Sequence, residues 1–195
     1  ALVDELVAKD PAALSKDEAR IVAAYKGYFD TAAIDAAGLA PAQPHLARIK
    51  NATTLAALAT LWGEPGYPSP LGGGVSVDAK EPTRYSVYFG SGGLGLPDRD
   101  SYLKTTPKDV EIQTKYREYL TFLFEQAGYA DAAGMAQKVY GFEDQIARTV
   151  SWDRATRRNR DLTYNALTPA QLAAIDPAFP VAAMLKAQGF DKTDR

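Results

Sequence analysis

The chain of 195 residues has no cysteine and only one histidine, His45. Without cysteine it can form no disulfide bond and no zinc site based on thiolates. A catalytic zinc site usually needs three protein ligands, commonly two histidines one helical turn apart plus an acidic residue. A single histidine cannot supply that pair, and we interpret His45 as an exposed loop residue. We therefore assign no catalytic residue and no metal ligand to this chain.

A long apolar run and a strong excess of one charge are also missing. No stretch approaches the roughly 20 consecutive apolar residues of a membrane-spanning helix. The net charge is −2 and the isoelectric point is near 5.5, whereas nucleic-acid binders usually carry a basic surface. We therefore expect neither a membrane span in this chain nor a nucleic-acid partner. With 46% hydrophobic and 24% charged residues, the composition is typical of a globular domain or of part of one.

Helix signals are frequent from the first third of the chain onward. Ser15 and Glu18 match a capping box, in which the hydroxyl and the carboxylate satisfy free amides at a helix start. The apolar period that follows predicts a single helix that ends at Gly38, where glycine can adopt a left-handed conformation. A second, shorter helix is expected over residues 53–62.

Two longer helices are predicted in the second half of the chain. The first begins at Pro107 and ends before Gly128, and the second covers residues 135–150. Two shorter helices follow, one opening at Thr168 and one over residues 181–188. The predicted apolar faces comprise Ile112, Tyr116, Tyr119, Leu120 and Leu123 on the first long helix, and Met135, Val139, Phe142, Ile146 and Val150 on the second.

Strand signals are confined to one place. Residues 75–78 and 85–89 are short and rich in β-branched and aromatic side chains, and Glu81-Pro82-Thr83 between them supplies turn residues. This pattern predicts one small β-hairpin. The fold expected from the sequence is therefore mainly α, a helical bundle-like body with a single hairpin.

The glycine-rich stretch after the second predicted strand matches G-x-G-x-x-G from Gly90 to Gly95. That pattern binds dinucleotides when a helix begins at the glycines and points its amides at a pyrophosphate. Here Pro97 disfavours helical geometry at Leu96, so we reject a dinucleotide cofactor and interpret the glycines as permitting a sharp turn. The next three residues, Asp98-Arg99-Asp100, are interpreted as a loop held together by fork-shaped hydrogen bonds of the arginine.

Four arginines fall between residues 154 and 160. One interpretation is a site for an anion or a substrate carboxylate, because arginine binds carboxylates in a bidentate manner. The other is a solvated or salt-bridged surface stretch. Both interpretations stay open, and Arg157 and Arg160 are the candidate substrate-binding residues. Tyr164 and Asn165, a few residues further on, are interpreted as packing and turn residues.

Residues 92–103 read Gly-Gly-Leu-Gly-Leu-Pro-Asp-Arg-Asp-Ser-Tyr-Leu. The segment resembles the GLGLPDRDYY signature of the neprilysin, endothelin-converting-enzyme and PepO family of zinc metallopeptidases, with Ser101 where the family usually has a second tyrosine. Other motifs match in order and spacing over about residues 15–190. They comprise Tyr25, Phe29, Asp30, Ile34, Asp35 and Gly38 in an early helix, Pro44, Leu46 and Ile49 after it, Glu143, Ile146 and Ala147 in a later helix, and Trp152, Arg160, Asp161, Tyr164 and Asn165.

The resemblance implies that residues 1–195 are part of the N-terminal helical region that covers the cleft of a larger, two-domain peptidase. The implied parent is a zinc metalloendopeptidase that hydrolyses small peptides and restricts substrate size by enclosing the active-site cleft. Its zinc and its His-Glu-x-x-His domain would lie on sequence absent from this chain, which would bind no zinc itself. The implied partners are the C-terminal catalytic part of the same protein and small peptide substrates.

A different class of function also fits the sequence. The chain is alternatively a free-standing, non-catalytic helical module that binds peptides or proteins. The animal members of the family are rich in disulfides, so by resemblance a cysteine-free chain is expected to be bacterial. Resemblance also favours a periplasmic or secreted location.

Overall fold

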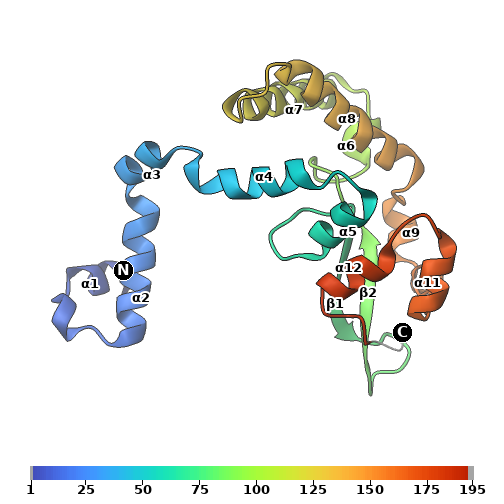
Figure 1. Ribbon diagram of the computed structural model, residues 1–195, viewed down its shortest axis with the longest axis horizontal. Helices are drawn as coiled ribbons and strands as arrows, with labels where there is room; N and C mark the ends of the chain where they lie inside the picture. Colours follow the sequence, from blue (N-terminus) through green and yellow to red (C-terminus); the bar gives the residue numbers. More distant parts are fainter. Residues whose placement is uncertain (1, 193–195) are drawn as a thin grey trace. The chain divides into compact units, whose positions relative to one another are not determined.

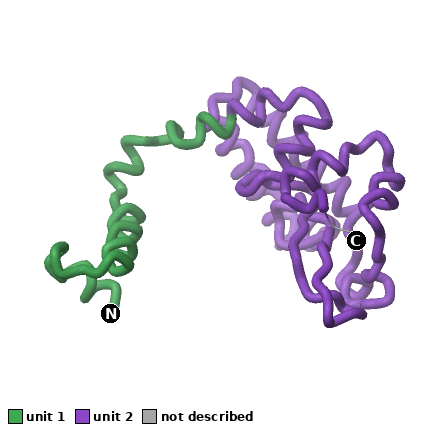
Figure 2. Tube along the Cα trace, turned by 60° about the horizontal axis from the view of Figure 1, so that its bottom comes forward, with its two compact units in different colours: residues 1–46 green, residues 47–195 purple. Residues whose placement is uncertain are grey.

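The computed structural model describes residues 2–192 and has the expected class of fold, mainly α with one β-hairpin (Figure 1). The chain divides into two compact units, Ala1–Leu46 and Ala47–Arg195 (Figure 2). Within the described residues, no helix has both the length and the apolar character that crossing a membrane requires.

The first unit is built around the pair of helices α1 (Leu2–Ala8) and α2 (Lys16–Phe29). The predicted capping box is confirmed: the Ser15 amide donates to a Glu18 carboxylate oxygen at 2.9 Å, and the Glu18 amide donates to the Ser15 hydroxyl at 3.3 Å. Leu6 and Val22 are the buried residues of the two helices. The start of α2 was therefore readable from the sequence, whereas α1 was not expected.

The single helix expected up to Gly38 is wrong, because the chain leaves helical geometry at Asp30. This residue has φ −78° and ψ 71°, and its side chain accepts a hydrogen bond from the Ala33 amide at 3.0 Å. It thereby caps a separate helix, α3 (Thr31–Ala37), which ends at Gly38 with φ +49°. A short aspartate side chain can compete for backbone amides in this way, which favours helix starts over helix interiors.

A helix not expected from the sequence, α4 (Gln43–Asn51), follows a 3-10 turn at Ala40–Ala42 and contains the boundary between the two units. His45 is exposed, as expected, but it lies on this helix and not in a loop. Pro44 is compatible with a helix here because the first-turn amides have no intrahelical acceptor to lose.

The sheet in the second unit consists of β1 (Leu71–Val77) paired antiparallel with β2 (Tyr85–Ser91), with Leu71 opposite Ser91. The predicted hairpin is confirmed, but β1 begins four residues earlier than expected, at Leu71-Gly-Gly-Gly. Three glycines have weak intrinsic strand preference. They extend the strand because β2 provides backbone partners along its whole length.

One face of the hairpin packs against helices from distant parts of the chain. Helices α5 (Leu55–Gly63) and α12 (Val181–Ala187) form the centre of this cluster. A Cβ on Gly63 would collide with the Met184 carbonyl, so the two helices approach as closely as they do because that position is glycine. The cluster comprises Ala59, Val181, Met184 and Leu185, with Leu71 and Phe89 from the strands packed against it.

The second cluster joins the signature segment to the two long helices, α7 (Pro107–Gln126) and α8 (Ala132–Thr149). Thr106 caps α7, and Gly128, with φ +79°, follows its end, as the sequence predicted. A short helix, α6 (Asp100–Leu103), forms inside the signature. The buried residues of this cluster are Leu96, Tyr102, Leu120, Ala136, Tyr140 and Ala147.

The apolar faces predicted for α7 and α8 are only partly buried. On α7, Leu120 is buried, whereas Ile112, Tyr119 and Leu123 are 41%, 56% and 43% exposed. On α8, Ile146 is buried, whereas Phe142 and Val150 are 59% and 54% exposed. The residues that α8 does bury are mostly smaller or polar: Ala132, Ala136, Tyr140, Glu143, Ile146 and Ala147.

The last part of the chain contains four short helices: α9 (Arg154–Arg158), α10 (Arg160–Thr163), α11 (Pro169–Ile175) and α12. The Thr168 start of α11 is confirmed as a capping box with Gln171. Helices α9 and α10 were not expected. Each is held by its cap, since Asp153 and Asn159 accept hydrogen bonds from the first free amides of the turn that follows.

Candidate functional site

The signature segment is fixed by a buried hydrogen-bond network centred on Tyr102. Its hydroxyl accepts hydrogen bonds from the Gly95 amide at 3.1 Å and the Leu96 amide at 2.9 Å, and donates to a Glu143 carboxylate oxygen at 2.9 Å. Tyr116 donates to the same carboxylate at 2.9 Å. Burial, followed by the nearby Glu143 carboxylate, raises the pKa of both tyrosine hydroxyls.

This network explains why glycine occupies position 95. A Cβ there would collide with the Tyr116 hydroxyl and lie 3.2 Å from Glu143. The Tyr102 hydroxyl therefore closes the Gly-Leu-Gly-Leu turn onto helix α8 through Glu143, which is only 9% exposed. The glycines permit a tight turn with close packing, in agreement with the interpretation of this stretch as a sharp turn.

The Asp98-Arg99-Asp100 triplet has a structural role, but not through arginine–carboxylate forks. Asp98 accepts hydrogen bonds from the Ser101 amide and hydroxyl, both at 3.1 Å. Arg99 reaches α8, where its Nε donates to the Ala147 carbonyl at 3.0 Å, and Asp100 pairs with Lys104 at 3.6 Å. Although burial opposes it, hydrogen bonding from Ser101 lowers the pKa of Asp98.

A cavity of about 210 Å³ lies beside the signature segment. Two arginines from different elements line it, Arg99 from the signature and Arg157 from helix α9. Asp98 and Trp152 line it as well. Arg157, which the sequence singled out as a candidate substrate-binding residue, thus lies beside a cavity. Arg160 is exposed on α10 and is not among the residues that line this cavity.

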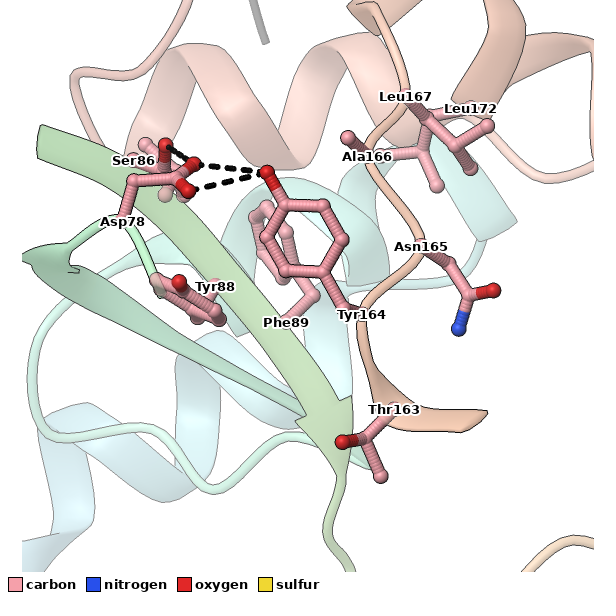
Figure 3. Close-up of a pocket in the computed structure, with 11 residues that line it drawn as sticks. Asp78, Ser86, Tyr88, Phe89, Thr163, Tyr164, Asn165, Ala166, Leu167 and Leu172 are labelled. Carbon is pink, nitrogen blue, oxygen red and sulfur yellow. Dashed lines mark hydrogen bonds between the residues drawn. The ribbon is translucent and has the colours of Figure 1, made fainter. Parts of the chain in front are cut away.

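A second cavity, of about 270 Å³, lies beside strand β2 and the extended segment that follows α10 (Figure 3). Tyr164 crosses it and donates to the Asp78 carboxylate at 3.0 Å. Asp78 also accepts from the Ser86 hydroxyl at 2.6 Å and from the amides of Lys80 and Glu81 at 2.9 and 3.0 Å. The Ser86 hydroxyl is the main cause that holds the pKa of Asp78 well below its usual value.

The interpretation of Tyr164 and Asn165 as packing and turn residues agrees with their contacts. The Lys80 ammonium lies 4.7 Å from the centre of the Tyr164 ring, and the Asn165 side chain donates to the Leu162 carbonyl at 2.9 Å. What the sequence did not reveal is the partner: Asp78 lies 86 positions away from Tyr164. No local pattern encodes such a pairing.

Within residues 2–192, no group of three or more histidine, aspartate and glutamate side chains is arranged to hold a metal ion. The buried carboxylates found here, Asp78 and Glu143, are each surrounded by hydrogen-bond donors from serine, tyrosine or backbone. The described residues therefore do not fit a zinc site.

The fold of this chain, a helical region with a single hairpin, is similar to that of part of a solved zinc metalloprotease. The structure is similar to Mycobacterium tuberculosis zinc metalloprotease Zmp1 in complex with an inhibitor, with a TM-score of 0.82 and 29% identity over 96% of this chain and 29% of that one. The open state of Zmp1 gives a TM-score of 0.79 at 30% identity, over 95% of this chain and 30% of that one.

Sequence comparison gives the same result and identifies the family. The chain belongs to peptidase family M13, whose N-terminal family model matches residues 1–195. It is 31% identical over 107 residues to endothelin-converting enzyme 1 of Cavia porcellus, and 32% identical over 104 residues to endothelin-converting enzyme-like 1 of Homo sapiens. These matches cover 53% of this chain, but only 14% and 13% of the two relatives.

Proposed function

We propose that the chain is the N-terminal helical region of a zinc metalloendopeptidase that hydrolyses small peptides. In this role the region covers the active-site cleft and restricts the size of substrates. The observation that carries the proposal is the family model over residues 1–195, together with the structural similarity to Zmp1 over 96% of the chain. Because the described residues do not fit a zinc site, the catalytic metal is proposed to lie in the C-terminal catalytic part of the same protein.

The distribution of exposed apolar side chains supports a packing partner. On α7, Ile112, Tyr119 and Leu123 recur at helical spacing, and each is more than 40% exposed. Phe142 on α8 is 59% exposed. Contiguous exposed apolar surface is typical of protein interfaces. The proposed occupant of this surface is the remainder of the peptidase.

Arg157 and Arg160 are proposed to contact the peptide substrate. Both are exposed and both lie on short helices whose starts are held by side-chain caps, so their backbone positions are defined. A guanidinium group is suited to bind carboxylates or carbonyl oxygens of a peptide. Family membership further supports a periplasmic or secreted location for the protein.

The test is to purify the full-length product of the gene that encodes this chain and to measure bound zinc by mass spectrometry and peptide hydrolysis by chromatography. We expect one zinc per catalytic centre and cleavage of short peptides. A folded protein offered as substrate should resist cleavage, whereas fragments of the same protein, made by unfolding and cutting it, should be cleaved. The matched control is the 195-residue chain, which should neither retain zinc nor cleave.

Two results would contradict the proposal. Stoichiometric zinc that supports cleavage by the 195-residue chain alone would show that the catalytic site is here. A full-length product that binds peptides without zinc and without hydrolysis would instead favour the non-catalytic binding module.

A further inference from the structure

The cavity beside the signature segment has an unusual balance of charges. Its lining contains two guanidinium groups, from Arg99 and Arg157, and one carboxylate, from Asp98. The Arg99 guanidinium is half-buried and anchored through Nε to the Ala147 carbonyl at 3.0 Å. Among residues 2–192, its terminal nitrogens and the whole Arg157 guanidinium form no hydrogen bond or ion pair.

The two nearby carboxylates are occupied by other donors. Asp98 accepts from the Ser101 amide and hydroxyl. Asp153 caps α9, where its two oxygens accept from the Ala155 and Thr156 amides and from the Thr156 hydroxyl, at 2.8 to 2.9 Å. These bonds from Thr156, together with the positive charge of Arg99, lower the pKa of Asp153. Both carboxylates are thus held ionised by contacts that leave the arginine donors unused.

We propose that this cavity is a binding site for a single carboxylate group of a peptide, held between Arg99 and Arg157. Each arginine offers parallel N–H donors that match the two oxygens of a carboxylate. The lining has a net charge of one positive unit (two guanidinium groups and one carboxylate), which suits a monoanion better than a doubly charged phosphate. Trp152, 44% exposed and lining the same cavity, offers an apolar surface beside the charged group.

The identity of the ligand as a peptide rests on the proposed function, whereas the preference for a carboxylate rests on the cavity itself. The carboxylate can come from the C-terminus of a peptide or from an aspartate or glutamate side chain. Arg160, which does not line the cavity, is not part of this site.

The experiment is a calorimetric titration of the 195-residue chain with three acetylated tetrapeptides. The first has a free C-terminus and no acidic side chain, the second is its C-terminal amide, and the third is an amide with one internal glutamate. We expect saturable binding of the first, no binding of the second, and binding of the third only if a side-chain carboxylate also enters. The variant Arg157→Ala should weaken binding of the first peptide by about tenfold to a hundredfold, because it removes charge-assisted hydrogen bonds.

The matched control is Arg158→Ala, on the same helix but not among the cavity residues. It removes the same charge and should change affinity by less than about twofold. The circular dichroism of both variants is compared with that of the unaltered chain.

Four outcomes would overturn the inference: equal binding of acid and amide, equal weakening by Arg157→Ala and Arg158→Ala, tighter binding of inorganic phosphate than of the peptide acid, or no binding at all. If the full-length product still cleaves peptides in any of these cases, the proposed function stands and only the carboxylate site fails.

Discussion

The two cavities of the second unit differ in how their charged groups are satisfied. Beside strand β2, the Asp78 carboxylate receives hydrogen bonds from Ser86, Tyr164 and two backbone amides. Beside the signature segment, Arg157 has no hydrogen bond or ion pair within the described residues. A charge whose partners are all internal contributes to the fold, whereas a charge with none beside a cavity is available to a ligand. The difference separates a structural site from a candidate binding site.

The largest expected effect comes from the loop that forms one wall of the arginine-lined cavity. Tyr102→Phe removes the hydroxyl that joins the Gly95 and Leu96 amides to Glu143. Because Tyr102 is 3% exposed, water cannot replace these bonds. We expect the free energy of unfolding to fall by about 2 to 3 kcal/mol, measured by urea denaturation. Tyr119→Phe, at a position 56% exposed, is the control and should be nearly neutral; similar losses from both variants would refute the role of the network.

A smaller loss of stability is expected from a substitution in the cavity beside β2. Tyr164→Phe removes one hydrogen-bond donor to Asp78 and keeps the ring over which Lys80 lies. The carboxylate retains Ser86 and two amides, so the expected loss is about 1 kcal/mol. The control is Tyr85→Phe, on a strand residue that is 72% exposed. If peptide binding were lost without any change in stability, Tyr164 would belong to a binding site and the contrast between the cavities would fail.

The Asp78 carboxylate should give the free energy of unfolding a specific pH dependence. Its pKa is lowered from the ordinary 3.8 in the folded state, so the unfolded chain binds the proton more readily. The contribution of Asp78 is then fully present above about pH 4 and is lost as the pH falls through the lower folded value. Denaturation curves between pH 2 and about pH 6 should therefore show a shallower acid loss of stability for Asp78→Asn than for the unaltered chain. Identical slopes for the two proteins would contradict the lowered pKa.

The smallest effect on the free energy of unfolding is expected from a substitution of Arg157. The side chain is exposed and forms no hydrogen bond or ion pair within the described residues, so Arg157→Ala should change the free energy of unfolding by no more than about 0.5 kcal/mol. Arg99→Ala should cost more, about 1 kcal/mol, because it removes the bond to the Ala147 carbonyl. Thermal and urea denaturation of the two variants provide the comparison. A large loss at Arg157 would indicate that this arginine has an internal partner and is not free for a ligand.

Much of the local structure was predictable from short sequence patterns. The capping box at Ser15 and the helix starts at Thr168 and Pro107 depend on side chains within three or four residues, and all three are confirmed. The family was predictable too, because residues 92–103 resemble a family signature, and the fold class was predictable from the helix and hairpin signals along the chain. The break at Asp30 was missed because a helical apolar period continues on both sides of it.

The sequence by itself determined where α2, α7 and α11 begin, that cysteine-based chemistry is excluded, and that the chain is a region of an M13 peptidase. Only the tertiary structure decided which apolar residues of α7 and α8 are buried, that Asp78 meets Tyr164, and that Arg157 shares a cavity with Arg99. The physical reason is the separation along the sequence of the residues that interact. Caps and turns are fixed by neighbours along the chain, whereas burial and charge pairing depend on residues brought together from distant positions.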